Sequence, residues 1–211
     1  MGSKIRNFVL QKKGIFSPFL LFLLILASCT NQVQERNDMQ IKIYPDPILS
    51  QRCEAVSPLD GNVNDILDQM AEKLYEWEGV GLAAPQVGIL KRMVVIDVRE
   101  EPGVLYKMIN PYITWRSEEI IDSEEGCLSL PKVGSVVKRN EKVVVEYLDE
   151  NFKQHKLEAD GLLARCIQHE LDHLDGKMYI DRLSSSDRED VIMRFYEIMD
   201  AEKEQKDQVE P

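Results

Sequence analysis

The segment from Leu162 to Leu174 constrains the fold more than any other, because it is strongly apolar and also carries two histidines. Its apolar residues recur at helical spacing, which predicts a helix that ends near Gly176. His169 and His173 stand four residues apart in the pentapeptide His-Glu-Leu-Asp-His. On a helix such residues share one face and lie about 6 Å apart along the axis. We therefore expect this helix at the centre of the protein, with both imidazoles buried.

Buried imidazoles need partners, and a divalent metal ion is one that two imidazoles on the same helix face can share. Glu170 projects beside the two histidines, where a carboxylate can take a proton from a water molecule. The alternative is two solvated histidines on an exposed helix face, which the apolar neighbours of the pentapeptide disfavour. The pattern therefore predicts a metal site at His169 and His173.

A metal site needs at least one further protein ligand. The only other histidine, His155, is predicted on an exposed strand of a hairpin. One class of zinc proteases continues the pentapeptide with a third histidine, but Tyr179 occupies that position here. Another class uses a downstream glutamate, for which Glu189 stands at a tolerable distance. This second class is the main alternative reading.

The four cysteines are too few and too scattered for a disulfide framework. Cys53 is predicted to be an ordinary thiol among polar loop residues. Cys166 precedes His173 by seven residues, about 10 Å along a helix axis, so it suits a pocket wall better than a shared ion. Cys127 follows a glycine. The sequence around it leaves two equal alternatives, a metal ligand and a small buried thiol.

Helices and short strands share the rest of the chain. Apolar periodicity predicts a helix over Asn62–Trp77, capped near Gly79, and another from Asp187 to about Ala201 with frayed polar residues after it. Strands are expected over Met93–Val98, Val104–Ile109, Val143–Tyr147 and Phe152–Leu157, with a turn at Asp149–Asn151. This mixture predicts an α+β domain in which small antiparallel or mixed sheets pack around the central histidine helix, with an N-terminal and a C-terminal helix.

The start of the chain differs from the remainder. Four basic residues precede an apolar run, Phe19–Ala27, which is too short to span a bilayer but fits the core of a signal peptide. The run ends in Leu-Ala-Ser-Cys, which resembles a bacterial lipobox with Cys29 as the lipidated residue. We therefore expect a leader over residues 1–28, a polar tether over 29–38 and a catalytic domain over 39–211. The alternative is a cytoplasmic protein whose translation starts at Met39.

The charge of the chain limits its partners. A net charge of −11 argues against a nucleic acid bound through its phosphates. Contact with a membrane is expected only through the leader or a lipid on Cys29, which would make the protein a membrane-anchored lipoprotein.

Three segments together resemble the peptide deformylase family. Residues 79–86, Gly-Val-Gly-Leu-Ala-Ala-Pro-Gln, are similar to the GxGLAAPQ motif of that family, Glu125–Pro131 to its EGCLS motif and Gln168–Gly176 to its QHExDHLDG motif. The segments follow the order and the approximate spacing of the family, and the resemblance covers about Met39–Leu183. Arg165 and the pair Gly-Cys at 126–127 are similar to the bacterial type.

The resemblance implies a metal-dependent hydrolase that removes the formyl group from N-formyl-L-methionyl peptides and releases formate. It implies that Cys127, His169 and His173 bind one ferrous ion (Fe²⁺) per chain, which zinc, nickel or cobalt can replace. The substrates would be chains emerging from ribosomes if the protein is cytosolic, or exported formyl-peptides if it is anchored.

The resemblance also implies roles for residues around the ion. Glu170 would exchange protons as general acid and base, and the side-chain amide of Gln86 and the backbone N–H of Leu128 would stabilise the oxyanion. Four further residues would bind the substrate, Gly81 through its backbone and the others as walls of the methionine pocket: Val80, Gly81, Leu162 and Cys166.

Overall fold

A computed structural model describes residues 39–100 and 102–209. The predicted leader, the tether and Cys29 lie outside these residues. Within the described part, none of the helices combines the length and the apolar composition that a membrane crossing requires.

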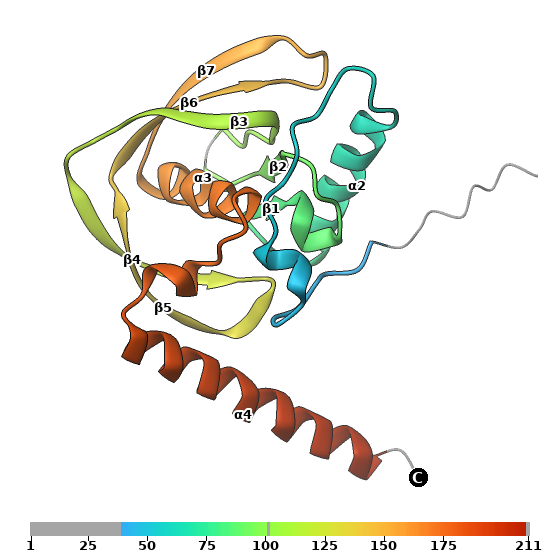
Figure 1. The fold of residues 1–211 in the computed structure, drawn as a ribbon, viewed down its shortest axis with the longest axis vertical. Helices are drawn as coiled ribbons and strands as arrows, with labels where there is room; N and C mark the ends of the chain where they lie inside the picture. Colours follow the sequence, from blue (N-terminus) through green and yellow to red (C-terminus); the bar gives the residue numbers. More distant parts are fainter. Residues whose placement is uncertain (1–38, 101, 210–211) are drawn as a thin grey trace, which may run out of the picture. The chain divides into compact units, whose positions relative to one another are not determined.

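The described residues form α-helices, short 3-10 helices (η) and strands, in agreement with the predicted α+β class (Figure 1). Their order along the chain is η1 (Pro47–Ser50), α2 (Val63–Glu76), β1 (Gly81–Ala83), η2 (Ala84–Val87), β2 (Met93–Ile96), β3 (Tyr106–Arg116), β4 (Ile120–Cys127), β5 (Leu130–Asn140), β6 (Lys142–Leu148), β7 (Gln154–Asp160), α3 (Gly161–Leu174), η3 (Tyr179–Arg182) and α4 (Ser185–Val209).

The strands build two antiparallel sheets. One has five strands in the order β1-β2-β3-β6-β7, and the other is the two-stranded ribbon β4-β5. Among the described residues the only parallel pairing is an isolated bridge between Glu54 and Lys91, which belong to neither sheet, so the sheets are antiparallel rather than mixed. β1 lies at the edge of its sheet, and β4 pairs with β5 on one side only.

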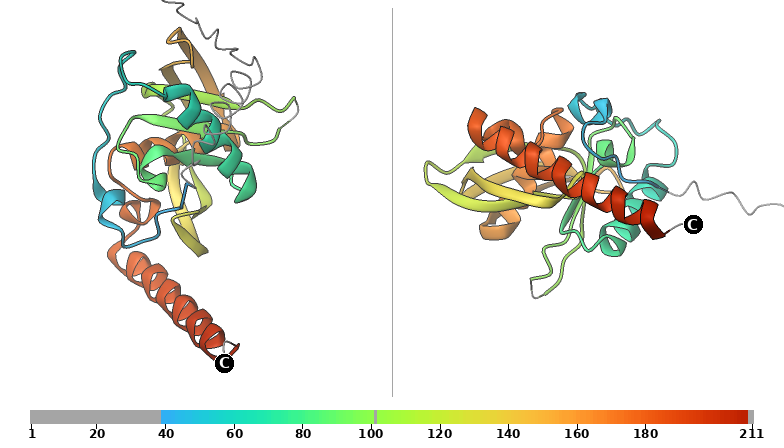
Figure 2. Two further views of the ribbon diagram at one scale, coloured as in Figure 1. Left: turned by 90° about the vertical axis from the view of Figure 1, so that its right-hand side faces the viewer. Right: turned by 90° about the horizontal axis from the view of Figure 1, so that it is seen from below.

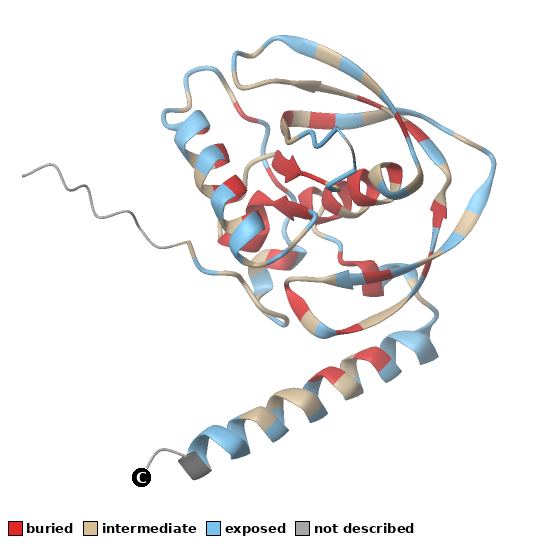
Figure 3. Cartoon of the chain, turned by 180° about the vertical axis from the view of Figure 1, so that it is seen from behind, coloured by how far each residue is buried: buried red, intermediate tan, exposed pale blue. Residues whose placement is uncertain are grey.

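Helix α3 is the predicted central helix, and it contacts strands of both sheets (Figure 1). It is buried along most of its length, as Figure 3 shows, and Ile167 and Leu174 are fully inaccessible. The helix ends as predicted near Gly176, whose φ of 71° is a left-handed conformation that glycine adopts without strain. Because α3 is fixed from both sides, the side chains that it carries have rigid positions.

The other two α-helices cover the sheets from outside. Helix α2 buries Leu67, Met70 and Leu74 completely in a second core cluster, which confirms the predicted periodic helix. Helix α4 packs on β5 (Figure 2). Val191 and Phe195 of the helix are buried in a core cluster with Val133 and Val137 of β5. It starts earlier and ends later than predicted. Its polar end was predicted to fray but remains helical to Val209, since most of its residues have good helix propensity.

The ribbon β4-β5 was not predicted from the sequence. β4 has a run of polar residues at its centre, Asp122–Glu125, and only Glu125 is buried, so the strand lacks the apolar alternation that marks a strand in the sequence. β3 was predicted to stop before Pro111 but continues to Arg116. The proline lies at a shift in register between Ile109 and Tyr112, where a strand tolerates a residue without an N–H.

The return strand β7 starts at Gln154 instead of Phe152. Phe152 has a φ of 58° and belongs to the turn, in which Asp149 Oδ1 accepts hydrogen bonds from the N–H groups of Asn151 and Lys153. The turn is therefore longer than the sequence suggested. β2 likewise ends at Ile96, two residues earlier than predicted.

Candidate metal centre and active site

Two elements distant in sequence bring a thiol and two imidazoles together. Cys127 ends β4, whereas His169 and His173 stand one turn apart on α3. One ligand atom of each residue lies within 4.8 Å of the others, and Cys127 Sγ is 3.3 Å from His173 Nε2. The cysteine at the end of β4 therefore lies beside the histidine pair of α3.

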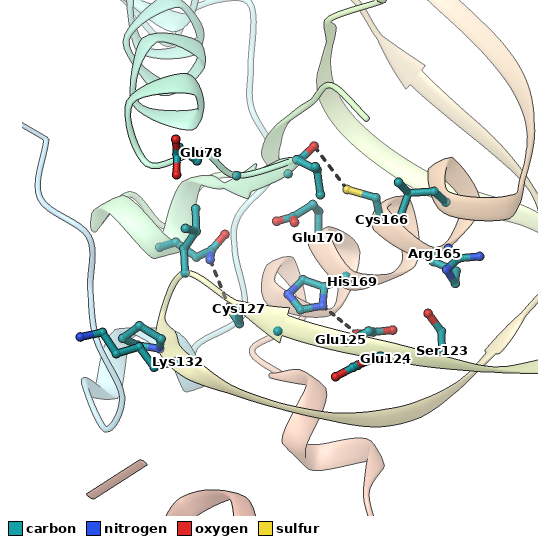
Figure 4. A pocket seen from close by; sticks show the side chains of 18 residues that line it. Glu78, Ser123, Glu124, Glu125, Cys127, Lys132, Arg165, Cys166, His169 and Glu170 are labelled. Atoms are coloured by element: carbon teal, nitrogen blue, oxygen red, sulfur yellow. Dashed lines mark hydrogen bonds and ion pairs between the residues drawn. The ribbon is translucent and has the colours of Figure 1, made fainter. Parts of the chain in front are cut away.

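His169 is held in one orientation from behind. Its Nδ1 lies 2.8 Å from Glu125 Oε2, which leaves Nε2 directed toward Cys127 (Figure 4). A carboxylate on the far nitrogen of an imidazole fixes the tautomer and the ring position of a metal ligand. The ring of Tyr179 also stacks on His169, with 6.2 Å between the ring centroids.

Glu125 is itself fixed by a buried arginine. Arg139 Nε and Nη2 donate to its two carboxylate oxygens at 2.6 and 2.8 Å, and Arg139 Nη1 donates to Asp172 Oδ2 at 2.6 Å. Asp172 also accepts from Arg182 of η3. Arg139 is 2% exposed, so this network of charges runs through the interior behind the ligands. The hydrogen bonds outweigh the effect of burial and hold the pKa of Glu125 at about 2.

The thiol is set up to lose its proton. Burial acts to raise the pKa of Cys127, but the charges and hydrogen bonds of His173 and His169 outweigh it and place that pKa well below its ordinary value. Those charges belong to protonated imidazoles, and a metal ion would displace their protons, because a thiolate and neutral imidazoles are the forms in which these residues bind a metal. The donor set therefore fits a divalent cation, with three protein ligands as in catalytic sites.

The other candidate ligands lie elsewhere. His155 lies on β7 and pairs with Asp149 Oδ2 at 2.7 Å. Glu189 is exposed on α4 and does not belong to the Cys-His-His cluster, which removes the basis of the protease alternative. Cys166 lies in the pocket wall, as predicted. Cys53 is a free thiol, also as predicted, but it is buried in the core, and burial raises its pKa to about 11.

Glu170 is a buried carboxyl beside these ligands. It is 3% exposed, and its Oε2 has no hydrogen-bond partner among the residues that the structure describes. Burial raises its pKa to about 7. The backbone of Gly81 lies so close that a Cβ at this position would come within 2.3 Å of Glu170 Oε1 and 2.6 Å of Cys166 Sγ. A carboxyl with a free oxygen and a pKa near neutrality can both accept and return a proton.

The side-chain amide of Gln86 lies next to the Cys127 thiol. Its Oε1 accepts from the N–H of Ala83 at 2.8 Å, which assigns the amide nitrogen to the side of Cys127. That nitrogen lies 3.5 Å from Cys127 Sγ and 3.3 Å from Ser129 Oγ. Gln86 is almost completely buried, so its donor group is fixed before any ligand enters.

A cavity of about 400 Å³ opens in front of these groups (Figure 4). The residues that the sequence predicted for the site line this cavity, except His173, which is buried: Val80, Gly81, Gln86, Cys127, Leu128, Leu162, Cys166, His169 and Glu170. The two edge strands β1 and β4 contribute to this wall. Cys29 is outside the described residues.

The sequence did not reveal the network behind the ligands. Glu125 was noticed only as part of a motif, and Asp172 only as part of the histidine pentapeptide. Arg139 stands in a polar stretch with no distinguishing neighbours, and only the pairing of β4 with β5 shows its place. No signal in a single sequence could have identified it.

Comparisons with known proteins agree with this geometry. The family model described as polypeptide deformylase matches residues 38–189. A peptide deformylase of Thermodesulfovibrio yellowstonii is 49% identical over 153 residues, which cover 72% of this chain and 92% of that protein. Among solved structures, a peptide deformylase of Ehrlichia chaffeensis is 36% identical with a TM-score of 0.72, and covers 76% of this chain and 96% of its own. One of Legionella pneumophila is 34% identical with a TM-score of 0.73, and covers 78% and 96%. The chain belongs to the polypeptide deformylase family.

Proposed function

We propose that this peptide deformylase removes the formyl group from the N-terminal methionine of polypeptides, with Glu170 as its general acid and base. The observation that carries the proposal is the buried carboxyl of Glu170, which has one oxygen without a partner in the described part of the chain. It stands beside the Cys-His-His cluster at the wall of a largely apolar cavity. This combination suits hydrolysis of an amide whose apolar side chain fills the cavity.

Cys127, His169 and His173 would hold the metal. When bound, a divalent cation at such a site lowers the pKa of water and polarises a carbonyl group. We propose ferrous iron as the native ion. Zinc, nickel or cobalt would be able to replace it, because a mixed thiolate and imidazole set accepts each of these ions.

Glu170 moves the proton. Its Oε2 takes a proton from the attacking water and returns it to the methionine nitrogen when the bond to the formyl carbon breaks. The pKa of about 7 suits both steps, because the group is neither a strong acid nor a strong base near neutrality.

Gln86 and Leu128 stabilise the negative charge that develops on the oxygen of the formyl group. The amide nitrogen of Gln86 lies beside Cys127, and Leu128 follows Cys127 in the cavity wall. We assign the Gln86 side-chain N–H and the Leu128 backbone N–H to the oxyanion. Donors in comparable sites contribute about 3 kcal/mol each to transition-state stabilisation.

The peptide would lie between two strand edges. β1 and β4 each have an edge that no described strand pairs, and both line the cavity. An extended peptide can form main-chain hydrogen bonds with such edges. Gly81 on β1 would bind the substrate backbone, and Val80, Leu162 and Cys166 would surround the methionine side chain.

Replacement of Gly81 tests how tightly Glu170 is packed. In Gly81→Ala the added methyl group would overlap Glu170 Oε1 and Cys166 Sγ, so we expect kcat/KM to fall by roughly 10- to 100-fold through displacement of the carboxyl. Metal content should stay the same. Gly61→Ala is the matched control, since a Cβ there meets nothing within 4 Å. Equal activity of the two variants would contradict the packing argument.

The activity itself is tested by release of formate. The iron-loaded protein should release one formate per formyl-Met-Ala-Ser consumed, and removal of the metal with a chelator should stop the reaction. If no formate appears with iron, zinc, nickel or cobalt, the proposal fails.

The location of the enzyme is a separate proposal, supported by the order of basic, apolar and small residues before Cys29. We propose that Cys29 becomes a lipidated N-terminus that anchors the enzyme, which then acts on exported formyl-peptides. Mass spectrometry of the native N-terminus should find a diacylglyceryl cysteine. A native chain that starts at Met39 would contradict the anchor and favour a cytoplasmic enzyme that acts on chains emerging from ribosomes.

A further inference from the structure

The wall of the cavity contains a cation that no acidic side chain of the described residues binds. Arg165 lines the cavity from α3, and among the described residues it has neither a hydrogen bond nor an ion pair, with its Nε–H buried and unsatisfied. Lys132, the other cation of the described wall, is paired with Glu202 of α4. Buried polar groups usually have a hydrogen-bond partner, so the unsatisfied Nε–H of Arg165 in the wall of this cavity requires an explanation.

The nearby carboxylates do not neutralise Arg165. Glu125 is occupied by Arg139 and His169, and Glu170 is buried beside the metal ligands. Glu124 is exposed on β4 and forms no ion pair with Arg165, and Glu78 stands at the other end of the cavity from Arg165 in Figure 4. The guanidinium therefore has donors free for a ligand.

Arg165 lies where the third side chain of a bound peptide would point. Arg165 precedes His169 by four residues, about 6 Å along the helix axis, and Figure 4 shows it at the same end of the cavity as Cys166 and Ser123. Alternate side chains of an extended peptide point to the same side and stand about 7 Å apart. If the methionine of a peptide along β4 contacts Cys166, the third side chain points to the same wall, farther from the metal ligands.

We propose that Arg165 is a specificity-determining residue that favours an acidic side chain at the third position of the formylated peptide. The inference rests on the proposed function and deepens it, because it concerns the same cavity. A guanidinium binds a carboxylate with charge-assisted hydrogen bonds. Arg165 is partly exposed, so solvent limits the gain, and we expect a preference of roughly three- to tenfold in kcat/KM.

Amidated peptides that differ in one charge test this preference. Formyl-Met-Ala-Asp-NH₂ and formyl-Met-Ala-Asn-NH₂ have nearly the same shape. The ratio of their two kcat/KM values, measured with the same variant, is independent of any effect on the chemical step that both peptides share. Arg165→Met, which keeps an unbranched apolar stem, should lower this ratio by roughly fivefold, whereas Arg165→Lys should keep most of it. Lys138→Met, outside the cavity on β5, should leave the ratio at its wild-type value.

One control tests the position of the acidic residue in the peptide, and another tests whether the preference is electrostatic. With formyl-Met-Asp-Ala-NH₂ and formyl-Met-Asn-Ala-NH₂ the ratio should not respond to Arg165→Met, because the second side chain points away from this wall. About 0.5 M salt should weaken the preference at the third position. An Asp/Asn ratio at the third position that is the same in wild type and Arg165→Met would overturn the inference while the proposed function stands. Absence of formate from every peptide with the iron-loaded wild type would overturn both.

Discussion

Glu170→Gln lowers kcat for formyl-Met-Ala-Ser by roughly 10²- to 10⁴-fold and leaves metal binding intact. The loss is expected because the amide has the shape of the carboxyl but can neither accept a proton from water nor return one to the leaving nitrogen. Glu170 is buried, and the structure shows no partner for its Oε2 among the described residues, so the variant should keep the fold.

Two measurements separate this effect from damage to the site. Formate release gives the rate, and elemental analysis gives the number of ions per chain. A variant that keeps more than a tenth of the wild-type kcat would contradict the role of Glu170. A variant that loses its metal would show instead that Glu170 maintains the ligand cluster.

Arg139→Met destabilises the folded protein by about 3–5 kcal/mol. Removal of one partner from a buried ionic network leaves the remaining charges without compensation, and that desolvation cost is the reason for the loss. Glu125 would keep only His169 as a partner, and Asp172 would keep only Arg182. Urea unfolding of the metal-free protein measures the change, since a bound ion would add its own binding energy to the stability.

The neighbouring residue supplies a matched control. Lys138 lies on the same strand and pairs with Asp122 at 2.9 Å, but both side chains are mostly exposed. Lys138→Met should therefore cost less than about 1 kcal/mol. If both variants unfold at the same urea concentration as wild type, the buried network does not stabilise the fold.

The parts of the fold that a single sequence predicts are those with periodic apolar residues. α2 and α3 follow the 3.6-residue period closely, and their boundaries were found within one residue. The ribbon β4-β5 could not be found in this way, because β4 has little buried apolar surface and is defined by its partner strand. The continuation of β3 through Pro111 likewise depends on a shift in register that only pairing reveals.

The site residues that could be predicted from the sequence are likewise those with a local pattern. The spacing of His169 and His173 is a local property of a helix, so the pair was readable from the sequence. Cys127 stood as an even choice between ligand and buried thiol, and only the resemblance to a family decided it. Arg139 acts through contacts with residues distant in sequence, and the lack of a partner for Arg165 among the described residues is likewise visible only in the fold.

The most direct test of the account is the spectrum of the cobalt-substituted protein. If Cys127 supplies the third ligand, wild type and Glu189→Ala should each bind one Co²⁺ and show thiolate-to-cobalt charge-transfer absorption, and Cys127→Ala should lose this absorption and bind the ion more weakly. A Cys127→Ala protein that keeps both the absorption and one tightly bound Co²⁺ per chain would contradict the site described above.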